Sequence, residues 1–202
     1  MLFIEFKNKM FDLGCFSNNQ VFSWKSGFER ANFVRWAKKG YIIKLRNGFY
    51  SFPEYFKVTG FDFYIANSIY SPSYISLHYA LHYYGIIPEG VSQITSVSSL
   101  KTSHFENKFG TFTYQTMRPG LLFGYEERHF GKWTIKFAVL EKAIIDLFYL
   151  YPFYNSEVEI EELRFDRDML NVDTDIMLKY VEKFKNKALE KRINLVLKVY
   201  DL

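Results

Sequence analysis

Apolar residues recur in the first sixty positions at the spacing of short amphipathic helices. One helical segment is predicted near residues 2–13, and two capping boxes follow it, Ser17 with Gln20 and Ser26 with Glu29. In a capping box, the serine hydroxyl and the later Gln or Glu side chain each bond the other's free backbone N–H. Because the boxes lie nine residues apart, the sequence predicts a short helix, a tight turn and a second helix.

The second of these helices, expected over residues 28–39, has two different faces. On a helical wheel Phe33, Trp36 and Ala37 share one side, as a stripe that faces the core should. The opposite side carries a small residue, an amide and cations: Ala31, Asn32, Arg35, Lys38 and Lys39. A helix in the major groove of DNA needs such a face, because cations contact phosphates and guanine and an amide can bond adenine. A solvated polar face explains the helix alone equally well.

A predicted hairpin follows this helix and favours the DNA-binding interpretation. Gly40 is a helix stop, and Asn47-Gly48 between short strands at 41–45 and 49–52 is the strongest two-residue hairpin signal. A capped helix pair followed by a small hairpin is typical of a winged helix-turn-helix. In this arrangement, two neighbouring stretches of the DNA phosphate backbone would pass the cations at the end of the helix and those of the hairpin, which include Lys44 and Arg46.

The rest of the chain mixes helical and strand patterns, and a change of composition near residues 54–60 marks a boundary. Helical spacing predicts helices at residues 62–70, 76–84, 140–149, 160–165, 173–184 and 187–201. Apolar runs predict strands at residues 93–98, 111–116, 123–129 and 133–138. We therefore expect an α+β protein, with a winged helix-turn-helix domain over residues 1–55 and a mixed α+β domain with a helical C-terminal end over residues 60–202.

Charge is spread unevenly over the 202 residues, whose formal net charge is +4. Residues 1–60 hold ten lysines and arginines against four acidic residues, whereas residues 61–150 hold seven against seven and residues 151–202 nine against eleven. This asymmetry indicates a polyanion partner for the N-terminal end. The single cysteine, the lack of a long apolar run and the lack of an export signal favour a cytoplasmic protein with no membrane partner.

Residues that could carry catalysis are few. His78 and His82 are four apart on one predicted helix, as two metal ligands would be, but no Glu follows His78 directly and no third ligand is evident. Glu141 and Asp146 share a predicted helix and lack the acidic–x–Lys strand pattern of nucleases. A phosphate-binding glycine loop and a Gly-x-Ser-x-Gly elbow are both absent from the sequence. We therefore expect no bound metal, no cofactor and no enzymatic activity.

Three stretches, in this order and spacing, resemble the AbiEi family, antitoxins of type IV toxin–antitoxin systems of the abortive-infection kind. They are VFSWKSGFERANFVRWAKKGYIIKLRNGFYSFPEY, YIANSIYSPSYISLHYALHYYGIIPE and FGYEERHFGKWTIKFAVLEKAIIDLFYL. The likeness spans roughly residues 15 to 200. Its most specific pieces, YISLHYALHYYGI and AVLEKAIIDLFY, carry no catalytic pattern of their own.

The resemblance implies an N-terminal winged helix that represses the protein's own operon at inverted repeats. Pairing of two copies on such a repeat is expected to add affinity. It also implies a C-terminal domain that counters a nucleotidyltransferase-like toxin without a stable complex. The DNA-contacting positions that it implies are Ser26, Asn32, Arg35, Lys38, Lys39, Lys44 and Arg46.

Two other functions stay open. One is a transcriptional regulator whose second domain senses a ligand or dimerises. The other is a nuclease that uses Glu141 and Asp146 as metal ligands and the winged helix only for docking.

Overall fold

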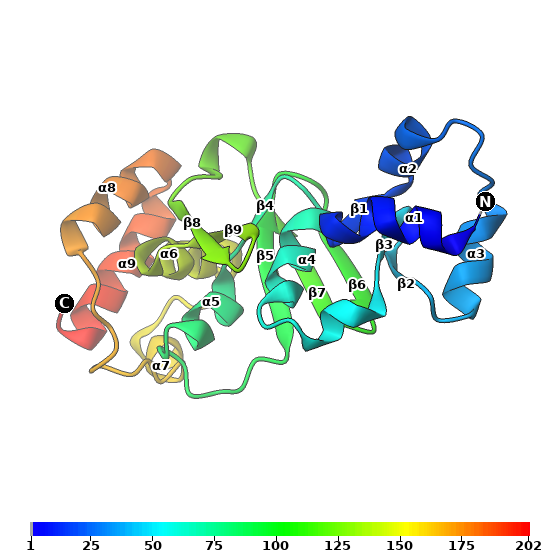
Figure 1. Cartoon of the computed structure of the whole chain (residues 1–202). Coiled ribbons are helices and arrows are strands. Elements are labelled where there is room, and N and C mark those ends of the chain that lie inside the picture. Colours follow the sequence, from blue (N-terminus) through cyan, green and yellow to red (C-terminus); the bar gives the residue numbers. More distant parts are fainter. Residues whose placement is uncertain (1) are drawn as a thin grey trace.

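The computed structural model describes residues 2–202, which form a mixed α+β fold with nine α-helices and two β-sheets. A small group of helices and strands at the N-terminal end is followed by a larger sheet and then by a group of helices, so the two termini lie at opposite ends (Figure 1). The prediction of an α+β fold is confirmed. Below, residues 2–57 are called the N-terminal region and residues 60–202 the sheet region.

The N-terminal region combines three α-helices with a three-stranded antiparallel sheet of order β1-β3-β2. Its elements are α1 (Phe3–Met10), a 3-10 turn (Phe11–Leu13), β1 (Cys15–Ser17), α2 (Asn18–Trp24), α3 (Ala31–Lys38), β2 (Ile43–Arg46), β3 (Phe49–Ser51) and a second 3-10 turn (Pro53–Lys57). The predicted hairpin is confirmed, and Gly48 at its turn has a φ of +79°, which L side chains rarely adopt. The strand β1 has no counterpart in the prediction.

Of the two predicted capping boxes, the structure confirms one. The Ser17 hydroxyl accepts from the N–H of Gln20, whose side chain accepts in return from the N–H of Ser17. The box of Ser26 and Glu29 is wrong, because α3 begins at Ala31 with no side-chain cap. Residues 25–30 instead form a turn that buries Phe28 in the core, where only 7% of it is exposed. Burial of this ring overrides the local capping signal.

Aromatic rings make up most of the core of the N-terminal region. Phe6 is fully buried and lies 4.7 Å from the ring of Trp36 and 5.4 Å from that of Phe16, measured between centroids. Phe33 of α3 stacks on Tyr50 of β3 at 4.7 Å, with ring planes 7° apart. These contacts fasten the buried face of α3 to the sheet, so its opposite face points to solvent.

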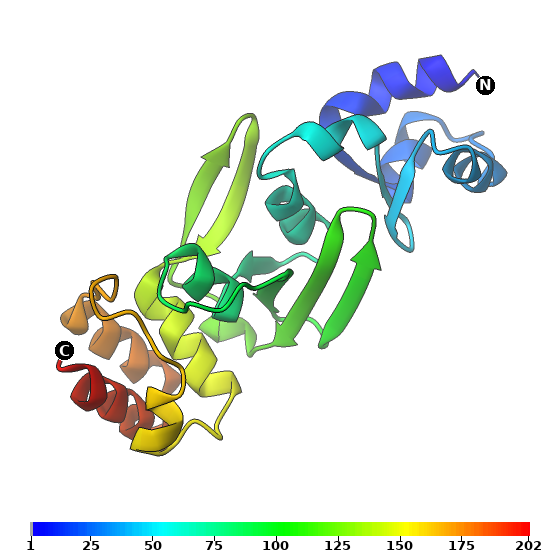
Figure 2. The same cartoon turned by 90° about the horizontal axis from the view of Figure 1, so that it is seen from below.

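The sheet region is built on a six-stranded mixed sheet of order β6-β7-β5-β4-β9-β8. Its strands are β4 (Ser73–Ile75), β5 (Gln93–Ser98), β6 (Ser103–Asn107), β7 (Gly110–Thr116), β8 (Tyr125–Phe130) and β9 (Trp133–Ala138). The pairs β4–β9 and β5–β7 are parallel, and the other neighbours are antiparallel. The hairpins β6–β7 and β8–β9 form the two edges (Figure 2). Strands β4 and β6 were not predicted.

Helices cover both faces of this sheet. Tyr114 of β7 donates to the carbonyl of Ala66 in α4 (Phe61–Ile69), while Tyr74 of β4, on the opposite face, donates to Asp146 in α6 (Leu140–Leu150). The other helices are α5 (Leu77–Tyr83), α7 (Glu157–Glu161), α8 (Thr174–Phe184) and α9 (Lys187–Tyr200). The helix expected at residues 160–165 is displaced toward the N-terminus, where Ser156 and Glu159 form a capping box. Within residues 2–202, none of these helices has the length and apolar character to cross a bilayer.

The two regions pack against each other around Gly14. An added Cβ at this residue would lie 2.9–3.1 Å from side-chain atoms of Phe61, Tyr64 and Trp133, so only glycine allows this approach. The hydroxyl of Tyr64 donates to the carbonyl of Leu13 at 2.9 Å. These contacts between residues far apart in the sequence hold the N-terminal region against the sheet region.

Candidate nucleic-acid interface

Two cations of the N-terminal region are paired with acidic side chains, and the others, the exposed Lys9, Arg30 and Lys57 among them, are not. Lys7 forms an ion pair with Glu54, and Lys25 lies 3.4 Å from Glu5. Lys7 lies on α1, and Lys25 directly follows α2. The neighbouring carboxylates offset much of the positive charge of these two lysines.

Four of the unpaired cations lie on α3, directly after it and on β2. Arg35, Lys38, Lys39 and Lys44 are all exposed, and within residues 2–202 no carboxylate oxygen lies within 4.0 Å of their side-chain nitrogens. Val34 is exposed beside them at 59% of its surface. The exposed side of α3 thus combines uncompensated cations with one apolar side chain.

Two of the predicted contact residues differ from expectation. Asn32 is 5% exposed, so its predicted place on the solvent-facing side of α3 is wrong. Its Oδ1 accepts a hydrogen bond from Nη2 of Arg35, one helical turn further on. Asn32 therefore orients the Arg35 guanidinium and has little surface of its own for a base. Ser26 is exposed in the turn before α3 and caps no helix.

The hairpin presents Lys44 to solvent but turns Arg46 inward. Lys44 lies opposite Tyr50 in the β2–β3 ladder and is exposed, whereas Arg46 is partly buried. Nε of Arg46 donates to the carbonyl of Ile69 at the end of α4. Burial lowers the pKa of this guanidinium. The predicted set of contact residues is therefore split by the structure: Arg35, Lys38, Lys39 and Lys44 lie on the exposed surface, and Arg46 lies against the sheet region.

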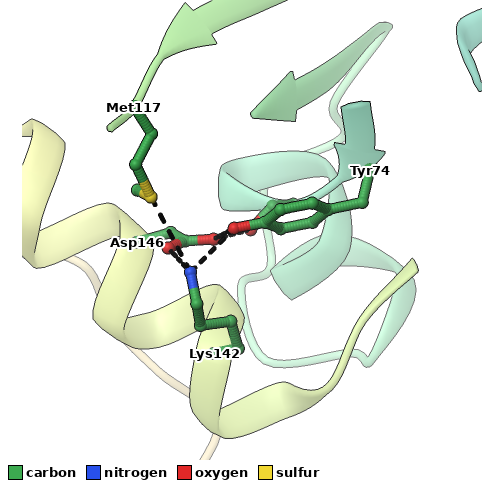
Figure 3. Close-up of polar contacts among 5 residues, drawn as sticks. Tyr74, Met117, Lys142 and Asp146 are labelled. Atoms are coloured by element: carbon green, nitrogen blue, oxygen red, sulfur yellow. Dashed lines mark hydrogen bonds and ion pairs between the residues drawn. The ribbon is translucent and has the colours of Figure 1, made fainter. Parts of the chain in front are cut away.

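A second concentration of ionisable groups lies inside the sheet region, between β4 and α6. Lys142 and Asp146 of α6 are both fully buried and form an ion pair (Figure 3). Nζ of Lys142 also donates to the hydroxyl of Tyr74 at 2.7 Å, and that hydroxyl donates to Oδ2 of Asp146 at 2.8 Å. Ser76 adds a further bond to the same carboxylate oxygen at 2.8 Å.

Burial dominates the electrostatics of this buried cluster. It lowers the pKa of Lys142 and raises the pKa of Asp146, because both charged forms lose their contact with water, while the attraction within the pair opposes both shifts. Burial and the neighbouring Asp146 together raise the pKa of the Tyr74 hydroxyl. Each carboxylate oxygen has a donor, so the cluster is satisfied internally and closed to a ligand.

The residues considered for metal binding do not converge. Glu141, which the nuclease alternative pairs with Asp146, accepts instead from the N–H of Asp173 at 2.8 Å. His78 packs edge-on against Tyr151 and burial lowers its pKa, whereas His82 is exposed. Over residues 2–202, no three His, Cys, Asp or Glu side chains are grouped so that they could hold a metal ion.

Compared with protein-family models and with curated proteins, the chain gives no match.

Sequence reasoning missed two features that the structure makes prominent. The exposure of Val34 was not predicted, because an apolar side chain at the margin of the buried stripe is normally expected to pack against the core. The pairing of Lys142 with Asp146 did leave a signal, since a cation and an anion four residues apart lie one above the other on a largely apolar helix. Their shared partner, Tyr74, lies 68 residues before Lys142, and no sequence pattern indicated that it would contact them.

Proposed function

We propose that this chain is a sequence-reading, double-stranded DNA-binding protein whose contact surface consists of α3 and Lys44. The exposed, unpaired cations of this surface carry the proposal. In water a cation without an acidic neighbour attracts phosphate with its full charge. A neighbouring carboxylate partly cancels the positive potential of a paired cation and weakens that attraction. The four cations Arg35, Lys38, Lys39 and Lys44 supply affinity on this surface.

Sequence preference comes from the side chains on the exposed side of α3. Arg35 is oriented by Asn32, and a guanidinium held in one direction can bond O6 and N7 of guanine together. Val34, exposed next to it, offers an apolar surface for the methyl group of thymine. The order of helices α2 and α3 followed by the β2–β3 hairpin supports a winged helix-turn-helix, in which the second helix enters the major groove.

The biological role follows from the resemblance to AbiEi. We propose that the protein represses its own operon at inverted repeats, with two copies paired on the DNA. We further propose that the sheet region counters a nucleotidyltransferase-like toxin, without a stable complex between the two proteins. The enclosed position of Asp146, away from Glu141, weighs against the nuclease alternative.

The DNA-binding proposal is tested with a duplex that covers the region directly upstream of the protein's own reading frame. The full chain should shift this duplex at lower concentration than a scrambled duplex of the same length and composition. Equal affinity for both duplexes would contradict sequence recognition. The antitoxin role is tested by co-expression with the neighbouring gene: growth should be rescued by the wild-type chain, and absence of rescue would contradict that role.

A further inference from the structure

We propose that Arg46 is a positioning residue for DNA binding, which fixes the β2–β3 hairpin to the sheet region and does not contact phosphate. The inference rests on the proposed DNA-binding function. Arg46 and Lys44 lie two residues apart on the same strand, but we assign the phosphate contact to Lys44 alone.

The register of the hairpin explains why the two cations diverge. In a regular strand, residues two apart point to the same side, so Lys44 and Arg46 would both face the DNA. The β2–β3 ladder pairs Lys44 with Tyr50 but Arg46 with Phe49, so one extra residue, Leu45, is inserted in β2. Such an irregularity redirects the side chains that follow it. Lys44 is exposed, whereas Nε of Arg46 reaches the carbonyl of Ile69 in the sheet region.

The Arg46 guanidinium lies among three aromatic rings that come from both regions. Its central carbon is 4.2 Å from the ring centroid of Phe49 in the hairpin, 5.6 Å from that of Phe105 in β6 and 5.9 Å from that of Tyr70 after α4. Its Nε donates to the carbonyl of Ile69. A phosphate that bound Nε of Arg46 would displace the bond to Ile69, whereas the Lys44 ammonium makes no hydrogen bond within residues 2–202.

The surroundings of Arg46 are themselves held in place. Tyr70 donates to the carbonyl of Lys101 at 2.7 Å and accepts from the Ser103 hydroxyl at 3.0 Å. Next to Arg46, the carbonyl of Leu45 accepts from Nδ2 of Asn107 at 3.1 Å. Side chains from both strands thus join β2 to β6: Arg46 reaches from the hairpin, and Asn107 reaches from the sheet.

The turn of the hairpin is held from its other side as well. The carbonyl of Gly48 accepts from the N–H of Asn18, the first residue of α2, at 2.9 Å. With one side fixed to α2 and the other to β6, the hairpin keeps a single orientation toward α3. Arg46 consequently sets where Lys44 meets the DNA backbone.

The experiment compares Arg46→Gln with Lys44→Gln in the full chain, with binding to the upstream duplex measured over a series of salt concentrations. Lys44→Gln should flatten the slope of log affinity against log salt by about 0.9, because one phosphate contact is lost. Arg46→Gln should weaken binding by on the order of two- to fivefold with the slope unchanged. Hydrogen exchange of the β2–β3 amides should accelerate in Arg46→Gln and not in Lys44→Gln.

A conservative variant separates a positioning role from a charge contact. Arg46→Lys should behave like Arg46→Gln, because an ammonium lacks the planar fork that stacks on rings while bonding Ile69. The inference is overturned if Arg46→Gln flattens the slope as Lys44→Gln does, if Arg46→Lys restores wild-type binding, or if hairpin exchange is unchanged. Failure of the wild-type chain to bind DNA would instead contradict the proposed function, and the exchange measurement would still test whether Arg46 holds the hairpin.

Discussion

Helices α3 and α6 both carry cations, but they place them in opposite surroundings. On α3, Arg35 and Lys38 are exposed and have no acidic partner among residues 2–202. On α6, Lys142 is fully buried and bonded to Asp146 and Tyr74. The residue type is the same, yet the first group is available to a polyanion and the second stabilises contact between a helix and a sheet. Pairing and burial, rather than charge alone, separate a binding surface from a structural element.

The largest expected effect comes from breaking the buried pair. Asp146→Ala leaves the Lys142 ammonium without its counter-charge in a dry interior, which should lower the free energy of unfolding by about 3–5 kcal/mol. Urea unfolding followed by circular dichroism measures this change.

The matched control replaces both partners by apolar residues of similar volume. The double variant Lys142→Met with Asp146→Leu should recover most of the lost stability, because neither charge then has to be buried. A loss below about 1 kcal/mol for Asp146→Ala, the range of exposed pairs, would contradict the assignment of this pair as a structural element.

The next effect concerns base recognition by α3. Arg35→Ala should cost roughly 1–3 kcal/mol of binding free energy on the preferred duplex and much less on a scrambled one, because a bidentate contact to one base is lost. Competition binding with the two duplexes measures the difference. A cost that is equal on both would make Arg35 a phosphate contact.

A smaller effect is expected from a single lysine of the same face. Lys38→Ala should weaken binding to every duplex alike and flatten the salt slope by about 0.9, because it neutralises a phosphate and reads no base. Fluorescence anisotropy at several salt concentrations provides the slope. If the slope does not move, Lys38 does not touch the DNA backbone.

The smallest effect comes from an exposed ion pair of the sheet region. Glu89 and Arg164 lie 2.6 Å apart, with side chains that are 54% and 65% exposed. Glu89→Gln should therefore change the free energy of unfolding by less than about 1 kcal/mol, in contrast to Asp146→Ala. A cost comparable to that of Asp146→Ala would remove the distinction between paired charges in water and in the interior.

Periodicity predicted the elements whose patterns are long. The helices α6, α8 and α9 and the strand β5 lie within one or two residues of their expected bounds. Strands β1 and β4 have three residues each, too few for alternation to be visible, and their partners are far away in sequence. The helix start at Ser26 failed for a similar reason, because burial of Phe28 depends on rings from α1 and α3.

The candidate interface was predictable where it depends on local sequence. Lys38 and Lys44 are exposed as the helix and strand patterns require. Arg46 was not predictable, because its partners Ile69, Tyr70 and Phe105 lie 23 to 59 positions away. Asn32 was misplaced because it lies at the margin of the apolar stripe of α3, where its burial depends on packing that periodicity does not show.

The central claim is that the unpaired cations of α3 and β2 contact DNA, and the salt dependence of affinity for the upstream duplex tests it most directly. If Lys38, Lys39 and Lys44 each neutralise one phosphate, the wild-type slope should be about −2.7 or steeper, and changing all three to glutamine should flatten it by about 2.7. A control with the same loss of charge at exposed Lys179, Lys187 and Lys191 should leave the slope unchanged. An affinity independent of salt, or equal changes in the two triple variants, would contradict the claim.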